Sequence, residues 1–159
     1  MIFITLGSQK FQFNRLLKAV DGLVENRKIK EEVFGQIGNS DYIPENFESR
    51  RFLDHKEFEC MMNRADVVIT HGGTGAIMSA IKKGKKVIAI PRLAKYGEHV
   101  DDHQIEIVGE FKNLDLICEC NDIENLSDAL DKVTTHEYKK YESNTQRILD
   151  NIEKFIDLI

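Results

Sequence analysis

Short apolar runs alternate with segments of helical periodicity along this chain, and this alternation constrains the fold more than any other feature. The candidate strands are residues 2–6, 32–37, 51–53, 66–70, 86–90 and 114–118. The candidate helices are residues 13–24, 58–64, 76–83, 101–110, 123–133 and 138–159. Strands that alternate with helices are typical of a parallel sheet. We therefore expect an α/β fold, a Rossmann-like parallel sheet with helices on both faces, in a single domain that spans residues 1–159.

Composition and charge narrow the function classes. The formal net charge of −5 argues against a general nucleic-acid role, because neutralising phosphates requires clustered Lys and Arg. The odd number of cysteines (Cys60, Cys118 and Cys120) and the lack of a signal-like start indicate reduced thiols in the cytoplasm. No apolar run approaches the roughly 20 residues that span a bilayer. We expect a cytoplasmic protein that reaches a membrane only through a partner.

A glycine-rich turn follows the strongest strand candidate and precedes a helix candidate: His71, Gly72, Gly73, Thr74 and Gly75. Glycines let the backbone approach a ligand, and a helix N-terminus offers unpaired N–H groups and a partial positive charge, which suit phosphate. The alternative is a tight turn that needs glycine for its backbone conformation and binds nothing. Three glycines in four residues exceed what a turn needs, so the pattern favours a phosphate site. Neither the dinucleotide pattern G-x-G-x-x-G nor a Walker A loop fits the chain.

A second polar segment, residues 91–104, follows the next strand candidate. Its cations Arg92 and Lys95 could hold a pyrophosphate, and Gln104 could meet a ribose or sugar hydroxyl. Ligands of such sheets bind beyond the carboxyl ends of the strands. Three segments should therefore converge there: Gly7-Ser8-Gln9, residues 71–75 and residues 91–104.

Two histidines of this segment, His99 and His103, lie four residues apart with Asp102 beside them, a spacing that could carry a metal. The alternative is the first turn of a helix, in which Asp101 and Asp102 complement the helix dipole. No third ligand with matching spacing is evident. We therefore expect no metal and no cofactor.

The two motifs, Thr70-His71-Gly72-Gly73 and Pro91-Arg92 with Tyr96-Gly97-Glu98-His99-Val100 and Asp102-His103-Gln104, support a family assignment when taken together. They resemble the C-terminal domain of glycosyltransferase family 28. Within it the chain is similar to small members: the soluble subunit of the two-part N-acetylglucosaminyltransferase that makes dolichol-linked chitobiose, and bacterial exopolysaccharide and capsule glycosyltransferase subunits. The opening residues 2–11 and 13–16 also resemble the exopolysaccharide group. The likeness covers most of residues 1–112.

The resemblance implies a single C-terminal half-domain of the GT-B type, acting as the donor-binding, catalytic subunit of a hexosyltransferase. Its donor would be a UDP-sugar. It would add a hexose or N-acetylhexosamine to a lipid-linked acceptor in exopolysaccharide, capsule or glycan precursor synthesis, by an inverting, metal-independent transfer. Carried over by motif, residues 71–74 face the donor phosphates, and Asp102, His103 and Gln104 lie near the donor sugar.

The resemblance also implies a partner. A GT-B enzyme has two Rossmann-like halves, and this chain has length for one. A separate membrane-anchored protein would supply the acceptor half and recruit the chain to the inner face of the membrane. The end of the predicted last helix carries an apolar stripe that either folds back on the sheet or docks on this partner: Ile148, Ile152, Phe155, Ile156 and Ile159.

One departure from the family pattern bears on the donor site. Related enzymes usually carry a Glu that binds the ribose hydroxyls, and Ser79 stands at that position. Serine can hydrogen-bond a hydroxyl only once and at shorter reach. This favours an alternative, a non-catalytic subunit that enhances a partner transferase. Two further alternatives are a lone sugar-nucleotide epimerase or hydrolase, and an interaction module with a vestigial site.

The sequence does not single out a general base. His99, with Glu98 adjacent, is a candidate for acting on an acceptor hydroxyl, and the base could instead lie in the partner.

Overall fold

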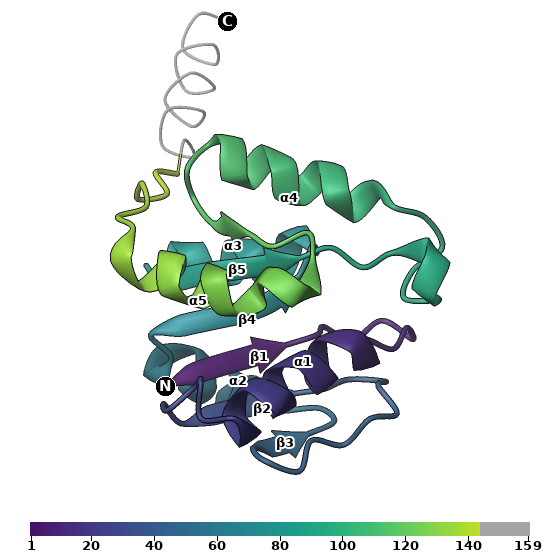
Figure 1. Cartoon of the computed structure of the whole chain (residues 1–159). Coiled ribbons are helices and arrows are strands. Elements are labelled where there is room, and N and C mark those ends of the chain that lie inside the picture. The colour runs from purple at the N-terminus through teal and green to yellow at the C-terminus, as the bar shows by residue number, and fades with distance from the viewer. Residues whose placement is uncertain (144–159) are drawn as a thin grey trace, which may run out of the picture.

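The computed structural model describes residues 1–143, and the strands in this part of the chain form one six-stranded sheet (Figure 1). Every neighbouring pair of strands is parallel, and the order is β3-β2-β1-β4-β5-β6. The strands are β1 (Ile2–Thr5), β2 (Val33–Gln36), β3 (Glu48–Arg50), β4 (Val67–His71), β5 (Lys86–Ile90) and β6 (Cys118–Glu119). This is the strand order of a doubly wound, Rossmann-like sheet, which confirms the predicted fold class.

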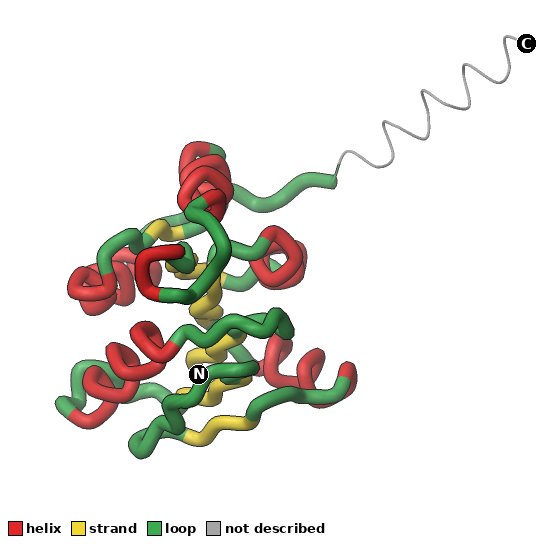
Figure 2. The backbone as a smooth tube through the Cα atoms, turned by 90° about the vertical axis from the view of Figure 1, so that its right-hand side faces the viewer, coloured by secondary structure: helices red, strands yellow, loops and turns green. Residues whose placement is uncertain are grey.

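Helices cover both faces of the sheet, as Figure 2 shows. The α-helices of the described residues are α1 (Asn14–Glu25), α2 (His55–Arg64), α3 (Thr74–Lys82), α4 (His103–Asn113) and α5 (Leu126–Thr135). Two short 3₁₀ helices, η1 (Ala94–Tyr96) and η2 (Ile123–Asn125), precede α4 and α5. The core residues of α1 and α5 pack together on one face, in front of the sheet in Figure 1. Those of α2, α3 and α4 pack on the other face.

The central strands are buried on both faces, which explains why they read as continuous apolar runs rather than alternating ones. Along β1, Ile2 and Ile4 belong to the cluster under α1 and α5, whereas Phe3 belongs to the opposite cluster. Along β5, Ile88 belongs to the cluster under α1 and α5, and Val87 belongs to the opposite cluster. These strands are rigid supports for the loops that follow them.

Several predicted boundaries were wrong. The third strand is Glu48–Arg50 rather than residues 51–53, because it is a polar edge strand without an apolar signal. The last strand is Cys118–Glu119 rather than residues 114–118. Helix α2 begins three residues earlier than predicted because Asp54 and Glu57 form a capping box.

The sequence predicted a helix over residues 138–159, but the structure has no helix at the start of this range. Residues 138–143 are not helical, and the backbone N–H of Lys139 donates to the Asp115 carbonyl at 2.9 Å. The remainder of that prediction, including the apolar stripe that begins at Ile148, lies outside the described residues. Within residues 1–143, no helix is both long enough and apolar enough to span a membrane.

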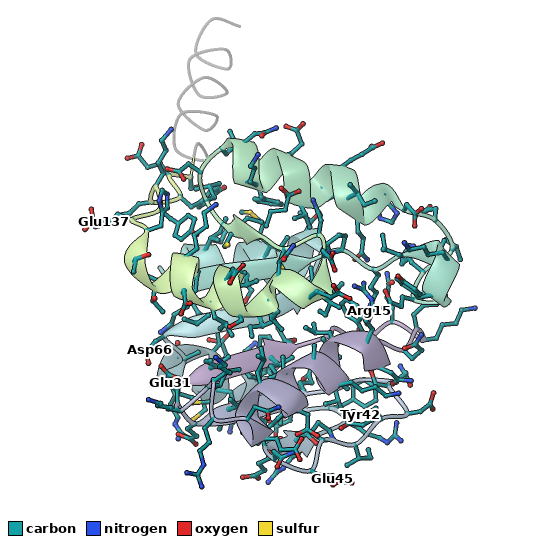
Figure 3. All side chains as sticks on the ribbon, in the orientation of Figure 1. Arg15, Glu31, Tyr42, Glu45, Asp66 and Glu137 are labelled. Atoms are coloured by element: carbon teal, nitrogen blue, oxygen red, sulfur yellow. The ribbon has the colours of Figure 1, made fainter. Side chains whose placement is uncertain are left out.

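Asp21 anchors the connection between β2 and β3 to α1. Its buried carboxylate accepts hydrogen bonds from the Tyr42 hydroxyl (2.6 Å) and from the backbone N–H groups of Glu45 (3.0 Å) and Asn46 (2.8 Å). Figure 3 labels Tyr42 and Glu45 in the lower part of the view. This buried acceptor therefore holds the loop to α1, in addition to the packing of Tyr42 and Phe47 against the core.

We expect Asp21→Asn to lower the free energy of unfolding by about 1–3 kcal/mol, because an amide nitrogen would face N–H donors. Urea denaturation with an unchanged m-value measures this. The exposed Asp41 gives a matched control, and Asp41→Asn should change stability by less than about 0.5 kcal/mol. Equal losses in the two variants would contradict an anchoring role for Asp21.

Candidate functional site

The loops that follow β1, β4 and β5 meet at the carboxyl edge of the sheet. The Arg92 Nη2 group, after β5, donates to the Leu6 carbonyl after β1 at 2.8 Å. The Gln104 Oε1 atom accepts from the backbone N–H groups of Gly72 (3.0 Å) and Arg92 (3.1 Å). Figure 3 shows Arg15 at this end of the sheet and Asp66 at the other. The structure therefore brings together the three segments in which the sequence predicted site residues.

His71 is the last residue of β4, not part of the turn, and its ring fills the space between two glycines. A Cβ atom at Gly73 would collide with His71 Nε2, and one at Gly7, where φ is +70°, would lie 2.8 Å from His71 Cε1. From the sequence we expected Gly73 to allow the close approach of a ligand and Gly7 to lie in a loop that converges on the same site. The structure shows that they also make room for the histidine.

His71 is uncharged at neutral pH. Burial, then the positive charges of Arg92 and His99, lower the pKa of His71 to about 4, although a hydrogen bond with the Thr5 backbone acts in the opposite direction. The side chain can therefore offer a phosphate a neutral hydrogen bond but not a positive charge. That it contacts donor phosphates stays a prediction.

Gly72 lets α4 pack directly against the turn after β4. A Cβ atom there would lie 2.8 Å from Gln104 Cβ and 3.0 Å from the Gln104 backbone oxygen. Gln104 is only 3% exposed, and its carbonyl oxygen already serves two backbone N–H groups. If Gln104 contacts a sugar or ribose hydroxyl, as predicted, its amide nitrogen would make that contact.

The N-terminus of α3 is the part of the site that is open to an anion. Thr74 and Gly75 form its exposed first turn, and no side chain of the described residues caps it. A Cβ atom at Gly75 would meet nothing within 4 Å. The first backbone N–H groups of such a helix have no partner within the helix and attract negative charge. Ser8 and Gln9 are exposed after β1, and Ser79 lies further along α3, partly buried.

Arg92 lies beneath the strand ends rather than on the surface of the site. It is 1% exposed, and its guanidinium carbon lies 5.5 Å from the Phe13 ring centroid. Burial lowers the pKa of Arg92 to about 10, against the opposing effect of Glu98, so the group remains charged at neutral pH. From the sequence we expected Arg92 to hold a pyrophosphate, but the enclosed side chain does not reach the surface of the site. The side chain instead contributes buried positive charge from below.

Arg15 and Glu98 form an ion pair that sequence reasoning missed. Glu98 is fully buried and accepts hydrogen bonds from Arg15 Nε (3.0 Å), Arg15 Nη2 (2.9 Å) and the Leu93 backbone N–H (3.0 Å). Arg15 Nη2 also donates to the Pro91 carbonyl at 3.2 Å. The pair joins α1 to the loop after β5, across 83 positions of sequence, and no local pattern signals it.

His99, Asp101 and His103 form a polar cluster at the start of α4. The Asp101 Oδ1 atom lies 3.2 Å from His99 Nδ1 and in contact with His103 Nδ1. The pKa of Asp101 is lowered, mainly by its hydrogen bonds with His103. Asp102, which sequence reasoning placed beside the histidines, instead accepts from the Ala94 backbone N–H at 2.7 Å.

A cavity of about 520 Å³ lies at the opposite end of the sheet from these loops. Glu137, labelled in Figure 3, lines it together with five lysines: Lys82, Lys85, Lys86, Lys139 and Lys140. Its positive charge could also attract an anion. It therefore competes with the α3 N-terminus as an anion site.

Comparison with known proteins identifies the family. The model of the glycosyltransferase family 28 C-terminal domain matches residues 1–159. The chain belongs to this family. The UDP-N-acetylglucosamine transferase subunit ALG13 of Kluyveromyces lactis is 29% identical over 105 residues, which are 63% of this chain and 51% of the relative. The human ALG13 subunit is 26% identical over 115 residues, 67% of this chain and 10% of the relative. The chain therefore spans about half the length of the yeast relative.

Solved structures of glycosyltransferases share the fold. An NMR structure of ALG13 has a TM-score of 0.60 at 16% identity, with 95% of this family 28 chain and 93% of that one covered. The kitacinnamycin glycosyltransferase has a TM-score of 0.63 at 18% identity, and the match covers 85% of this chain and 35% of that enzyme. Acinetobacter baumannii MurG has a TM-score of 0.56 at 18% identity, and the match covers 95% of this chain and 49% of MurG. The chain thus corresponds to the C-terminal half-domain of GT-B enzymes, as its sequence predicted.

Gly72 and Gly75 provide a matched pair of substitutions in this turn. Gly72→Ala should lower the free energy of unfolding by about 1–3 kcal/mol, because the added methyl group overpacks the contact with Gln104. Gly75→Ala adds a methyl group in open space within a helix, so it should raise stability by about 0.4–1 kcal/mol. Urea denaturation measures both changes. A tolerated Gly72→Ala would show that α4 does not depend on this contact.

The lowered pKa of His71 gives a stability prediction with a definite sign. Between its usual pKa of 6.5 and its folded value of about 4, the unfolded chain binds a proton that the folded chain does not. Lowering the pH through this window should therefore remove roughly 2–3 kcal/mol of stability through His71. The measurement is the free energy of unfolding from pH 7 to pH 4 for the wild type and His71→Gln. The variant should show a shallower pH dependence, and parallel curves would refute the assignment.

Proposed function

We propose that this family 28 chain is the donor-binding, catalytic subunit of a glycosyltransferase that uses a UDP-sugar. It adds a hexose or N-acetylhexosamine to a lipid-linked acceptor in the synthesis of exopolysaccharide, capsule or a glycan precursor. The observation that carries the proposal is the uncapped N-terminus of α3, exposed at Thr74 and Gly75 and placed between the loops that follow β1 and β5. In a sheet of this strand order, the topological switch point where ligands bind lies between β1 and β4, next to this position.

The charges around this position suit a diphosphate. The backbone N–H groups of the first turn of α3 supply hydrogen bonds, and the Thr74 hydroxyl can add another. Arg92 contributes positive potential from below, in surroundings that screen it less than water does. His71 is neutral and supplies a hydrogen bond at most. In this proposal the donor diphosphate is recognised mainly by backbone groups.

The acceptor half is supplied by a partner in this proposal. The chain covers 35% of the kitacinnamycin enzyme and 49% of MurG, so it corresponds to only part of those chains. Both ALG13 relatives are named as subunits of a transferase. A membrane-anchored partner would bind the lipid-linked acceptor and recruit this chain to the inner face of the membrane. The transfer would be inverting.

The partner could also supply the general base. His99 packs against the Phe11 ring, with ring centroids 5.1 Å apart, and its side chain is only 8% exposed. This position restricts its access to an acceptor hydroxyl.

Ser79 favours a second candidate function, that of a non-catalytic subunit that enhances a partner transferase. It stands where related enzymes carry a ribose-binding Glu, and it is partly buried in α3. An enhancer would raise the turnover of its partner without binding the donor itself.

Thermal stabilisation by nucleotides, combined with one charge substitution, tests the proposal. A ligand present at 100 times its dissociation constant stabilises the folded chain by about 2.7 kcal/mol. We expect UDP and one UDP-sugar to do so, and GDP-sugars and NAD not to. Thr74→Glu should leave the free chain as stable or more stable, because a carboxylate suits the first turn of a helix. The same charge should abolish stabilisation by UDP.

Thr74→Gln is the matched control, since it has the same shape without the charge and should retain most of the UDP effect. If Thr74→Glu binds UDP as well as the wild type does, the diphosphate does not lie at α3. Repeating the panel with the partner present separates the two candidate functions. Turnover enhancement without any donor binding to this chain would establish the enhancer.

A further inference from the structure

We infer that His99, Asp101 and His103 form a binding site for a divalent first-row metal ion, with Zn²⁺ as the ion that suits it best. Each residue offers one ligand atom, and the three atoms lie within 4.8 Å of one another. Within residues 1–143, no other group of three histidine, cysteine or carboxylate ligands comes together in this way. From the sequence, Asp102 was the carboxylate expected beside the two histidines, but it accepts a hydrogen bond from the Ala94 backbone N–H instead.

The backbone places the two histidines on different elements. His103 is the first residue of α4, whereas His99 lies in the turn that follows Gly97, where φ is +67°. The turn brings the imidazole rings to a centroid separation of 4.8 Å at an interplanar angle of 68°. Asp101 lies between them, and its Oδ1 atom faces the Nδ1 atoms of both rings. One cation can therefore bind all three groups from a single side.

The donor set selects the class of ion. Two imidazole nitrogens and one carboxylate oxygen are typical ligands of Zn²⁺, which binds them at about 2.0–2.2 Å in tetrahedral geometry. Harder ions such as Mg²⁺ and Ca²⁺ prefer all-oxygen sites. Three protein ligands leave the fourth position of Zn²⁺ open for water or a substrate oxygen.

Burial gives the site one fixed ligand and two adaptable ones. The His99 side chain is 8% exposed and is held against the Phe11 ring. The side chains of Asp101 and His103 are 56% and 46% exposed, so an ion can reach them and they can rotate toward it. Small rotations suffice, because the Nδ1 atom of His99 and the Oδ1 atom of Asp101 are already 3.2 Å apart.

The site adjoins the loops assigned to the donor. Its last ligand, His103, immediately precedes Gln104, which hydrogen-bonds the turn at Gly72. If the proposed donor function holds, this site lies next to the loops that bind the donor. Metal binding itself does not require that function, so it is tested without nucleotide.

The experiment is a titration of the untagged, metal-stripped full chain with Zn²⁺ by calorimetry and with Co²⁺ by absorption spectroscopy. We expect one ion per chain and visible d–d bands of tetrahedral nitrogen and oxygen ligation. Asp101→Asn and His103→Gln should each weaken Zn²⁺ binding by at least about tenfold. Both residues are exposed, so the variants should keep the wild-type melting temperature without metal.

His136→Gln is the matched control. His136 also pairs with an aspartate, at 2.8 Å from Asp115, but this pair belongs to no group of three ligands among the described residues. Its substitution should leave Zn²⁺ affinity unchanged. Three results would each overturn the proposal: no saturable binding, equal affinity in wild type and His103→Gln, or the intense charge-transfer bands of thiolate ligation, which would point to a cysteine.

Discussion

The amide oxygen of Gln104 accepts hydrogen bonds from the backbone N–H groups of Gly72 and Arg92, and the arrangement of the site depends on this contact. It joins the turn after β4, the loop after β5 and the first turn of α4 with one buried acceptor. Gly72 is required because any side chain there would push α4 away. The Arg15–Glu98 pair fixes the far side of the same loop to α1. The parallel sheet brings these segments to one edge, and these polar contacts hold them in place.

The buried charge at this edge of the sheet favours an anion at the strand ends. Arg92 is charged but enclosed, and His71 next to it is kept neutral by burial and by the charge of Arg92. The exposed part is the first turn of α3, where backbone N–H groups offer hydrogen bonds. If a phosphate binds here as we propose, fixed backbone dipoles recognise it and need little rearrangement on binding. The lysines that line the cavity at the other end of the sheet can also attract anions, although Lys85 and Lys86 are half-buried and donate hydrogen bonds to backbone carbonyls.

The sequence predicted the parts of this molecule that follow from local patterns. Apolar runs located the central strands, and because carboxyl ends of parallel strands share an edge, it also placed the three site loops together. It could not find β3, whose residues Glu48–Arg50 carry no apolar signal. It could not pair Arg15 with Glu98, or choose Asp101 over Asp102, since these contacts depend on how loops fold in three dimensions. Local spacing likewise assigned Gly73 to a ligand, whereas the tertiary structure shows His71 filling the space beside it.

Backbone amide chemical shifts during a UDP titration test the central claim most directly, and a chain of 159 residues suits NMR. If the diphosphate binds at the N-terminus of α3, as we propose, UDP should cause saturable shifts of the amides of Gly73, Thr74, Gly75 and Ala76. Smaller changes are expected after β1 at Ser8 and Gln9. The amides around Lys82, Lys85 and Lys139 should not move. Saturable shifts centred on the lysine-lined cavity, with the α3 N-terminus unaffected, would contradict the account.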